Sequence, residues 1–501
     1  MIQGGRLAYE KGYGVANLEY NIPITPETIF HVASVSKQFT AMALVLLEQD
    51  GKLSLEDDVH KYLPELPDYG SKISIRNLLQ HTSGIRDQWQ TLSLAGWRMD
   101  DVITQQQIVR MLFRQKELNF PPGTRHLYSN GGYTLAAEIA ARVAGKPFPQ
   151  FCDERIFRPL GMTRTHFHDD LRRIVPGRAY SYRKVKEGYE ADPLNYANVG
   201  ATSLFTTATD LVKWLDNFRA PKVGGAGAIA RLQEQALLAD GKKIDYALGL
   251  TTGSYRGLKK ISHAGGDAGF RSYVLWFPEL ELGVAVVSNL GSFDPGQAAR
   301  KVAEVFAGQK MTAQAEEPKR QYVAVDAGSL APYAGTYRLD SGMLVQVTTD
   351  GGKLMATAGD DAFELKPLGP KRFWAEPMAA DVEFGTAPGG GTTLTVKQAS
   401  GNSEGGRIVV TPFDPKEAAQ YLGAYWSEEL ETQYTIVAKD GKLYADHAHH
   451  GLITLTAVAR DEFKGSEWFM PNVTFVRDGA GHVTGFAVGG GRVSAIRFTR
   501  R

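Results

Sequence analysis

The chain has 501 residues, 43% hydrophobic and 22% charged, so at roughly 150 residues per domain it has room for about three domains. This composition excludes disordered, collagen-like and coiled-coil proteins. Lysine and arginine number 56 against 55 acidic residues, and the formal charge of +1 gives no strong field to hold nucleic acid or an anionic membrane, so neither is expected as a partner.

No segment is typical of a membrane span or a secretion signal. The longest strongly apolar stretch, 41–47, is far shorter than the ~20 residues that cross a bilayer. Residues 1–6 lack a signal sequence, so the chain as given is expected in the cytoplasm, or in the periplasm or outside the cell if its start is truncated. The one cysteine, Cys152, excludes an intrachain disulfide and is expected to be a buried apolar side chain.

Three helices are predicted from apolar residues that recur at helical spacing. The first follows Ser34 and stops at Gly51, the second follows Gly132 and stops at Gly145, and the third begins near Asp210. Between residues 258 and 289 the spacing changes. The apolar runs there are 258–263, 270–277 and 283–289. They predict an antiparallel meander, and with the helices they indicate an α+β domain over residues 1–308.

A polar segment, residues 309–325, is predicted to be a linker that leads to an internal repeat. In this repeat, 333–337 recurs as 421–425, 352–354 as 441–443, and 382–384 as 473–475. Each copy is a string of short strands between turns. We therefore expect two small antiparallel β-barrel domains, over residues 326–411 and 412–501.

Ser34-Val35-Ser36-Lys37 opens the first predicted helix with a hydroxyl and an amine. A serine hydroxyl is a poor nucleophile until a base removes its proton, and residues three apart on a helix share a face, so Lys37 can reach Ser34. The start of a helix also favours a developing anion. The alternative is a helix-capping serine with a solvated lysine. The same spacing recurs at 181–184, but no apolar helical face follows it there.

Tyr128-Ser129-Asn130 follows a rigid turn and precedes the second predicted helix. A phenol close to a lysine can exchange protons with a serine, and the amide of Asn130 can orient a substrate carbonyl. The alternatives are a packing tyrosine and a turn asparagine. A similar triplet at 196–198 lies in a loop beside Pro193.

His263-Ala264-Gly265-Gly266 ends the first strand of the meander. Its glycines let a substrate backbone lie close to the strand edge, and the N–H groups of Gly266 and Ser34 can together form an oxyanion hole. His263 is either part of this site or a hydrogen-bonded strand histidine. Arg271 either holds a substrate carboxylate or is a solvated strand residue.

A polar cluster in the second repeat contains Asp446, His447, His449 and His450. Such residue types can bind a metal, but a strand followed by a turn accounts for them better. We therefore expect no metal and no organic cofactor.

The order, spacing and placement of the three motifs resemble the penicillin-recognising serine hydrolases. This family contains class C β-lactamases, D-alanyl-D-alanine carboxypeptidases, D-aminopeptidases and esterases. The resemblance covers roughly residues 5–305, with support from 81–84, 148–162 and 200–210. The two barrels make the chain most similar to three-domain D-aminopeptidases. The implied roles are nucleophile for Ser34, base partner for Lys37, proton shuttle for Tyr128, substrate orienter for Asn130, and opposite wall for His263 and Gly265.

The resemblance implies a serine acyl-hydrolase that cleaves an amide or ester bond of a small substrate through an acyl-serine. A D-amino-acid peptidase, amino- or carboxypeptidase, or a related esterase is expected. Two alternatives stay open: a β-lactamase or penicillin-binding protein with weak turnover, and a non-catalytic protein that retains the pocket. The sequence does not decide whether Lys37 or Tyr128 is the main base, because the pair would titrate together. Nor does it decide whether the barrels shape the cleft, form a homodimer or bind cell-wall fragments.

Three features depart from the family pattern. The chain starts almost at the first strand, so the family's opening helix is not expected. His263-Ala264-Gly265 replaces Lys-Thr-Gly, which removes the cation and hydroxyl that clamp a penicillin carboxylate and makes efficient β-lactamase or DD-carboxypeptidase action less expected. The connection 463–473 is short, so no loop from the last domain is expected in the cleft, which favours a general peptidase or esterase over a D-aminopeptidase.

Overall fold

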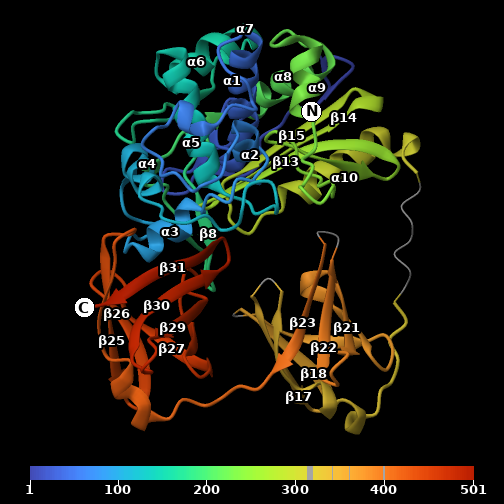
Figure 1. The fold of residues 1–501 in the computed structure, drawn as a ribbon. Coiled ribbons are helices and arrows are strands. Elements are labelled where there is room, and N and C mark those ends of the chain that lie inside the picture. Colours follow the sequence, from blue (N-terminus) through green and yellow to red (C-terminus); the bar gives the residue numbers. More distant parts are fainter. Residues whose placement is uncertain (313–319, 341, 360, 399–400) are drawn as a thin grey trace. The chain divides into compact units, whose positions relative to one another are not determined.

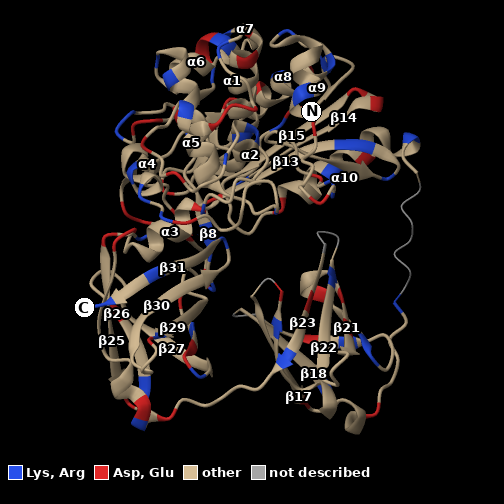
Figure 2. Cartoon of the chain, viewed as in Figure 1, with Lys and Arg blue, Asp and Glu red and all other residues tan. Residues whose placement is uncertain are grey.

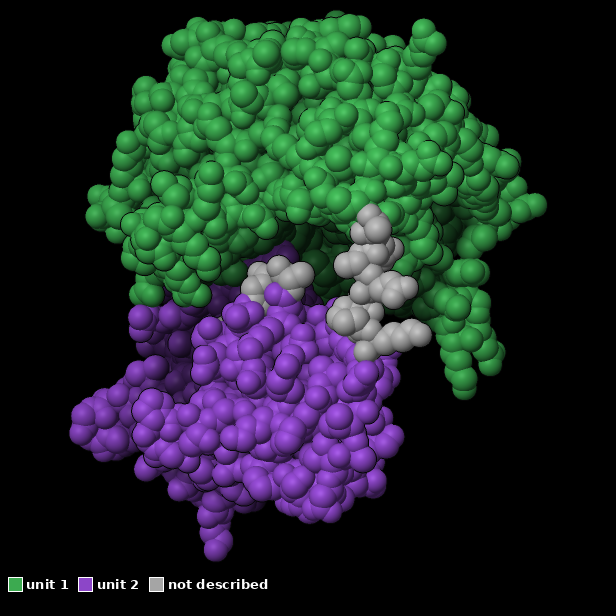
Figure 3. All heavy atoms as spheres, turned by 90° about the vertical axis from the view of Figure 1, so that its right-hand side faces the viewer, with its two compact units in different colours: residues 1–93, 97–313 green, residues 94–96, 314–501 purple. Residues whose placement is uncertain are grey.

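The computed structural model describes residues 1–312, 320–340, 342–359, 361–398 and 401–501 (Figure 1). The chain divides into two compact units, residues 1–93 with 97–313 and residues 94–96 with 314–501 (Figure 3). Part of the predicted linker, residues 313–319, lies outside the described residues. The domain boundaries at residues 308, 325 and 411 stay predictions. Figure 2 shows basic and acidic residues interspersed along both units, in keeping with the near-zero net charge.

The first unit is built around a six-stranded antiparallel sheet with the order β12-β13-β14-β15-β1-β2. Its strands are β12 (Thr251–Tyr255), β13 (Leu258–Asp267), β14 (Phe270–Phe277), β15 (Leu282–Ser288), β1 (Ile2–Gln3) and β2 (Arg6–Leu7). Strands β13 to β15 are the meander predicted from the sequence. Alternate residues of β14 face opposite sides: Tyr273 and Leu275 pack with helix α10 (Pro295–Ala307), and Val274 and Trp276 pack into the main helical core.

The main helical core surrounds α1 (Lys37–Gln49), which is buried from Lys37 to Leu47. Helix α1 packs against α5 (Asn130–Ala144) and α9 (Gly225–Leu232), and α8 (Ala208–Arg219) packs on β15. The three predicted helices are therefore present. The first begins at Lys37 rather than at Ser34, because Ala33–Ser36 form a tighter 3-10 turn, η1.

The remaining helices of the first unit are α2 (Ile75–Leu79), α3 (Gln88–Leu94), α4 (Gln105–Phe113), α6 (Phe148–Cys152) and α7 (Arg158–Leu160). Its short strands are β3 (Val15–Asn17), β4 (Ile22–Pro23), β5 (Phe30–His31), β6 (Ile103–Thr104), β7 (His166–Phe167), β8 (Tyr182–Lys184), β9 (Tyr189–Ala191), β10 (Tyr196–Ala197) and β11 (Leu204–Thr206). Cys152 is fully buried, and this burial raises the pKa of its thiol well above the ordinary value. No helix among the described residues has both the length and the apolar character needed to cross a bilayer.

The second unit contains two closed antiparallel barrels of eight strands each. The first consists of β16 (Gly335–Leu339), β17 (Leu344–Asp350), β18 (Lys353–Ala358), β19 (Asp361–Pro367), β20 (Arg372–Ala375), β21 (Ala380–Thr386), β22 (Thr392–Gln398) and β23 (Gly401–Ile408). The second consists of β24 (Gly423–Ser427), β25 (Thr432–Lys439), β26 (Lys442–His447), β27 (Gly451–Ala459), β28 (Glu462–Gly465), β29 (Asn472–Arg477), β30 (Val483–Gly490) and β31 (Val493–Arg500). Closure leaves neither barrel with a free sheet edge. The predicted fold class, an α+β domain followed by two β-barrels, is confirmed.

Candidate active site

Ser34 lies in η1, the turn between β5 and α1, and is partly exposed between buried neighbours. Ala33 before it has φ of 48°, in the left-handed region that side chains with a Cβ rarely adopt. Buried hydrogen bonds hold this turn. The Ser36 hydroxyl donates to the Ala33 carbonyl (2.5 Å) and accepts from the Leu204 N–H (3.1 Å). A local hydrogen bond and one from the distant Leu204 thus hold a turn that presents the Ser34 hydroxyl to the outside.

Lys37 is fully buried at the start of α1, and its Nζ lies 3.1 Å from the Ser34 Oγ. The same nitrogen donates to the Asn130 Oδ1 (2.8 Å) and to the carbonyl of Ala201 (2.7 Å). Those two oxygens can only accept hydrogen bonds, whereas the Ser34 hydroxyl can both donate and accept. Of these three contacts, the one with Ser34 is therefore the one through which Lys37 can take or return a proton.

Asn130 is held in one orientation by a carboxylate that the sequence analysis did not single out. The Oδ2 of Asp87 accepts from both the backbone N–H (3.0 Å) and the side-chain Nδ2 (2.8 Å) of Asn130. Asp87 is 2% exposed. Because Nδ2 is committed to Asp87, the Asn130 Oδ1 must face Lys37.

Tyr128 packs in an aromatic cluster beside Lys37. The Lys37 Nζ lies 4.9 Å from the centroid of the Tyr128 ring, and the centroids of the Tyr128 and His81 rings are 4.0 Å apart. His81 also accepts the N–H of Ser129 at its Nδ1 (3.1 Å), which anchors the Tyr128–Asn130 loop. The three motif residues Ser34, Lys37 and Tyr128 thus meet around one amine.

His263 lies in β13 with both ring nitrogens hydrogen-bonded. Its Nδ1 lies 2.7 Å from the Ala264 carbonyl and must be the protonated nitrogen, so its Nε2 accepts from the Tyr246 hydroxyl (3.0 Å). Burial, together with the nearby charge of Lys37, lowers the pKa of His263 to about 3. The side chain is therefore a neutral imidazole at physiological pH, and it supplies no positive charge to the site.

Gly265 is required where β13 meets η1. A Cβ at this position would lie 2.3 Å from both the Ser272 Oγ and the Val32 carbonyl oxygen. At Gly266 a Cβ would meet nothing closer than the Arg271 side chain at 3.6 Å, an ordinary contact. Packing within the protein explains the glycine at 265 but leaves the one at 266 unexplained.

Arg271 lies opposite Gly266 in the β13–β14 pair, and its Nη1 donates to the carbonyls of Ala268 (2.8 Å) and Phe270 (2.7 Å). Its neighbour Ser272 donates to the Val32 carbonyl and so faces η1. Because successive strand residues face opposite sides, Arg271 points away from η1. This placement does not favour a role in holding substrate, and the predicted role stays untested.

A second carboxylate, half-buried, fixes the end of β13. The Asp267 Oδ2 accepts from the Thr202 hydroxyl (2.6 Å) and from the His31 Nε2 (3.1 Å). Burial by itself raises the pKa of Asp267, but the hydrogen bonds from His31 and Thr202 bring it below its ordinary value. Asp267 therefore anchors β13 as an ionised group.

The second Ser-x-x-Lys sequence, 181–184, and the polar cluster of the second repeat make contacts of their own. Ser181 donates to the Asp192 carbonyl beside the β8–β9 hairpin, where residues three apart face opposite sides. In the second barrel, the His447 Nε2 bonds the Thr432 hydroxyl (2.8 Å). No group of three or more histidine, cysteine, aspartate or glutamate side chains in the described part of the chain is arranged to hold a metal.

Three functional candidates escaped the sequence analysis: Asp87, Tyr246 and the Ala201 carbonyl. Each contacts a motif residue that is distant in the chain. Asp87 directly precedes α3, where an acid is indistinguishable by sequence from a helix cap. No local sequence pattern marks Tyr246 as a functional residue.

The comparisons with known proteins agree with one another. The family model described as Beta-lactamase matches residues 1–308. Penicillin-binding protein 4* of Bacillus subtilis (strain 168) is 30% identical over 408 residues, covering 76% of this chain and 88% of the relative. A D-aminopeptidase of Brucella anthropi is 25% identical over 523 aligned residues, covering 100% of this chain and 94% of the relative.

Several solved structures have similar folds. The octameric penicillin-binding protein homologue from Pyrococcus abyssi has a TM-score of 0.58 at 24% identity, covering 80% of this chain and 94% of that one. The D-amino acid amidase from Ochrobactrum anthropi SV3, complexed with L-phenylalanine amide, has a TM-score of 0.52 at 25% identity, covering 61% and 92%. Oligomerisation of the present chain, as the expected homodimer, stays a prediction.

Proposed function

This chain belongs to the beta-lactamase family and is a serine hydrolase, and from that premise we propose that it hydrolyses amide or ester derivatives of D-amino acids through an acyl-Ser34 intermediate. The observation that carries the proposal is the 3.1 Å contact between the Lys37 Nζ and the Ser34 Oγ, with two further Lys37 hydrogen bonds fixed on carbonyl oxygens.

In the first step, with Lys37 as the neutral amine, the Ser34 Oγ attacks the substrate carbonyl carbon and its proton passes to Lys37, with Tyr128 as the partner that relays it. The N–H groups of Ser34 and Gly266 stabilise the resulting oxyanion. Collapse of the tetrahedral species breaks the amide or ester bond, and the leaving amine or alcohol takes the proton. Water then attacks the acyl-Ser34 ester by the same route, releases the acid and restores the hydroxyl.

The neutral imidazole of His263 favours substrates without a carboxylate at the reacting end. A carboxylate buried against this uncharged ring loses its hydration, and the ring itself supplies no compensating cation. Amides, esters and the N-terminal bond of a longer peptide place no charge there. This supports a D-aminopeptidase or D-amino acid amidase over a DD-carboxypeptidase.

The relatives support the same choice. D-aminopeptidases align over the whole chain, barrels included, and a D-amino acid amidase has a similar fold over 61% of the chain. Because penicillin-binding protein 4* is among the relatives, slow reaction with β-lactams is the second candidate function. The short 463–473 connection, which favoured a more general peptidase, does not outweigh D-aminopeptidase relatives of full length.

The test combines an active-site probe with a substrate panel. Wild-type protein should gain one adduct on fluorophosphonate treatment, seen by intact mass, and Ser34→Ala should gain none. The panel compares D-alanine p-nitroanilide, its L-isomer, a short-chain nitrophenyl ester and nitrocefin, and hydrolysis of the D-anilide should exceed that of the L-isomer. Turnover retained in Ser34→Ala would refute the nucleophile, and absence of any adduct in the wild type would indicate a non-catalytic binding protein.

A further inference from the structure

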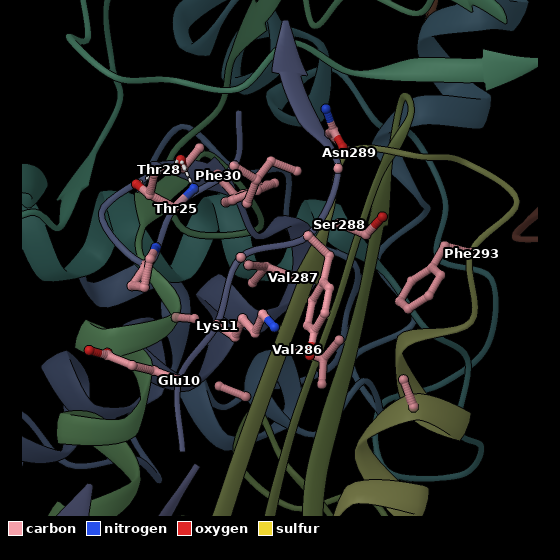
Figure 4. A pocket seen from close by; sticks show the side chains of 18 of the residues that line it. Glu10, Lys11, Thr25, Thr28, Phe30, Val286, Val287, Ser288, Asn289 and Phe293 are labelled. Carbon is pink, nitrogen blue, oxygen red and sulfur yellow. Dashed lines mark hydrogen bonds between the residues drawn. The ribbon is translucent and has the colours of Figure 1, made fainter. Parts of the chain in front are cut away.

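A cavity of about 280 Å³ lies inside the first barrel, strands β16 to β23 (Figure 1). The residues that line it are apolar except at one end, where Gln398, Asn402 and Ser403 contribute amide and hydroxyl groups. The hollow beside β15 in the first unit differs, because loop residues such as Lys11 and Thr25 form part of its border (Figure 4). A closed sheet surrounds the barrel cavity, so hydrogen-bonded strands fix its wall.

One end of this barrel is filled by aromatic side chains, and the second barrel is packed in the same way there. The rings are Tyr337, Phe373 and Phe384 in the first barrel and Tyr425, Phe463 and Phe475 in the second. Neighbouring ring centroids are 5.6–5.7 Å apart in the first set and 5.6–6.0 Å apart in the second. These shared contacts allow the two barrels to be compared position by position.

Further along the strands the two interiors differ. In the second barrel the rings of Phe486 and Phe498 are stacked with centroids 4.6 Å apart, and the Tyr434 ring lies 5.4 Å from that of Phe498. All three side chains are buried. Packed aromatic rings therefore occupy this part of the second barrel.

Strand register identifies the counterparts of these rings in the first barrel. One matching cross-strand pair is Tyr337 with Val345, and Tyr425 with Tyr434. A matching row of three is Phe384, Leu394 and Gly405, and Phe475, Phe486 and Phe498. A valine, a leucine and a glycine thus stand where the second barrel has three rings, and the cavity is the space that those rings fill.

Gly405 keeps this space open, because its strand approaches β16 closely. A Cβ at Gly405 would lie 1.9 Å from the Arg338 carbonyl oxygen, so no side chain fits at this position. An empty apolar cavity lowers stability in proportion to its volume. The interior of an eight-stranded barrel is either filled by side chains or holds one small ligand. With the three rings absent from the first barrel, a ligand is the remaining way to fill it.

The polar end of the cavity is also its entrance. Met343, 46% exposed, and the exposed Asn402 both line this end. The apolar lining deeper in the barrel is buried, with Val347 1% and Leu394 1% exposed. A ligand with a polar head and an apolar tail would therefore enter tail first.

Size and charge limit the class of ligand. An apolar cavity of about 150 Å³ takes up benzene, so the larger one here has room for roughly ten carbon atoms. Among the described residues, no charged side chain lines it. At the entrance the Gln398 Nε2 donates to the Met378 carbonyl (2.9 Å), and the Ser403 hydroxyl donates to the Asp340 carboxylate. An anionic head group would find no cation in this lining and would meet a like charge.

We propose that the first barrel binds a neutral amphiphile with an aliphatic chain of roughly eight to ten carbon atoms, such as a medium-chain alcohol. The chain fills the cavity, and the hydroxyl or amide head lies beside Gln398 and Asn402. The proposal is independent of the chemistry at Ser34.

The test is isothermal titration calorimetry of the full chain with the alcohols from 1-butanol to 1-octanol. We expect saturable binding of one molecule per chain, with an affinity that rises about fourfold for each added methylene, as burial of that group requires. Octanoate at pH 8 should bind at least about tenfold more weakly than 1-octanol, because its charge would be desolvated without a partner.

Two variants place a ring in the cavity, as the second barrel does. Val345→Phe and Leu394→Phe should each weaken 1-octanol binding at least about tenfold, and neither should lower the melting temperature in scanning calorimetry, because the new ring enters existing space. Gln346→Phe is the matched control on the same strand. Gln346 is exposed on the outer face of the barrel, so this variant should bind as the wild type does.

Four outcomes would overturn the proposal. One is absence of saturable 1-octanol binding by the wild type. Another is wild-type affinity in both cavity variants, which would place the alcohol elsewhere on the chain. The third is a lowered melting temperature in both variants, since overpacking would mean that the space is not there. The fourth is octanoate binding as tight as that of 1-octanol, which would exclude a preference for neutral head groups.

Discussion

The neutral state of His263 predicts that the first unit loses stability as the pH is lowered. Burial lowers the pKa of this side chain from 6.5 to about 3. The folded state therefore binds fewer protons than the unfolded state between those values, so stability is complete above pH 6.5 and falls as the pH decreases towards 3. At 1.36 kcal/mol per pH unit, the loss from this one group amounts to about 2 kcal/mol between pH 8 and pH 5.

The assay is urea unfolding at pH 8 and pH 5, followed by tryptophan fluorescence. His166, His168 and His447 also have pKa values lowered to about 4, chiefly by burial, so the wild type should lose more than 2 kcal/mol in total. In His263→Gln the loss between the two pH values should be smaller by about 2 kcal/mol. His482→Gln changes a histidine with a 79% exposed side chain and should lose stability as the wild type does. Equal losses in His263→Gln and wild type would refute the assignment of a buried neutral imidazole.

Asp87→Asn leaves the shape of the site intact but removes the charge that orients Asn130. Since a hydrogen bond to a charged group is worth about 1.5–3 kcal/mol, fluorophosphonate acylation should slow by about 10- to 100-fold with folding preserved. Gly265→Ala should cost about 1–3 kcal/mol of stability and most of the activity, because the new methyl group has no room beside η1, whereas Gly253→Ala on β12 has open space and should change neither. Tyr246→Phe leaves a buried nitrogen without its donor and should lower the free energy of unfolding in urea by about 1–3 kcal/mol.

Each of these variants has an outcome that would contradict its reasoning. Acylation of Asp87→Asn at the wild-type rate would show that Asn130 needs no anchor. If Gly265→Ala and Gly253→Ala changed stability and activity equally, the close contact between residue 265 and η1 would not be needed for function. A stability loss in Tyr246→Phe no larger than in Tyr20→Phe, at a 76% exposed position, would remove the hydrogen bond to His263.

Local geometry explains why part of the site could be predicted. Ser34 and Lys37 are three residues apart at a helix start, so helical spacing alone brings the hydroxyl and the amine together. Their apolar neighbours repeat at the same spacing, and this identified α1 as a core helix. The strands of the meander were predictable for a similar reason, because runs of apolar residues between turns need no distant partner to be recognised.

Other contacts depend on segments that are distant in the chain. The Asp87–Asn130 bond joins residues 43 apart, and the Lys37–Ala201 bond joins residues 164 apart. No local pattern marks either partner. The direction of the Arg271 side chain could not be predicted either, because a shift of one residue in strand register exchanges the two faces of a sheet. Only the observed pairing places its side chain away from η1.

The amino-acid sequence alone determined the architecture, the candidate nucleophile and its amine partner, because these follow from periodicity and from neighbours on one helix. The tertiary structure decided the orientation of Asn130, the charge of His263 and the anchoring of β13 by Asp267. Each of these depends on burial and hydrogen bonding among segments that are distant in the chain. No single segment contains that information.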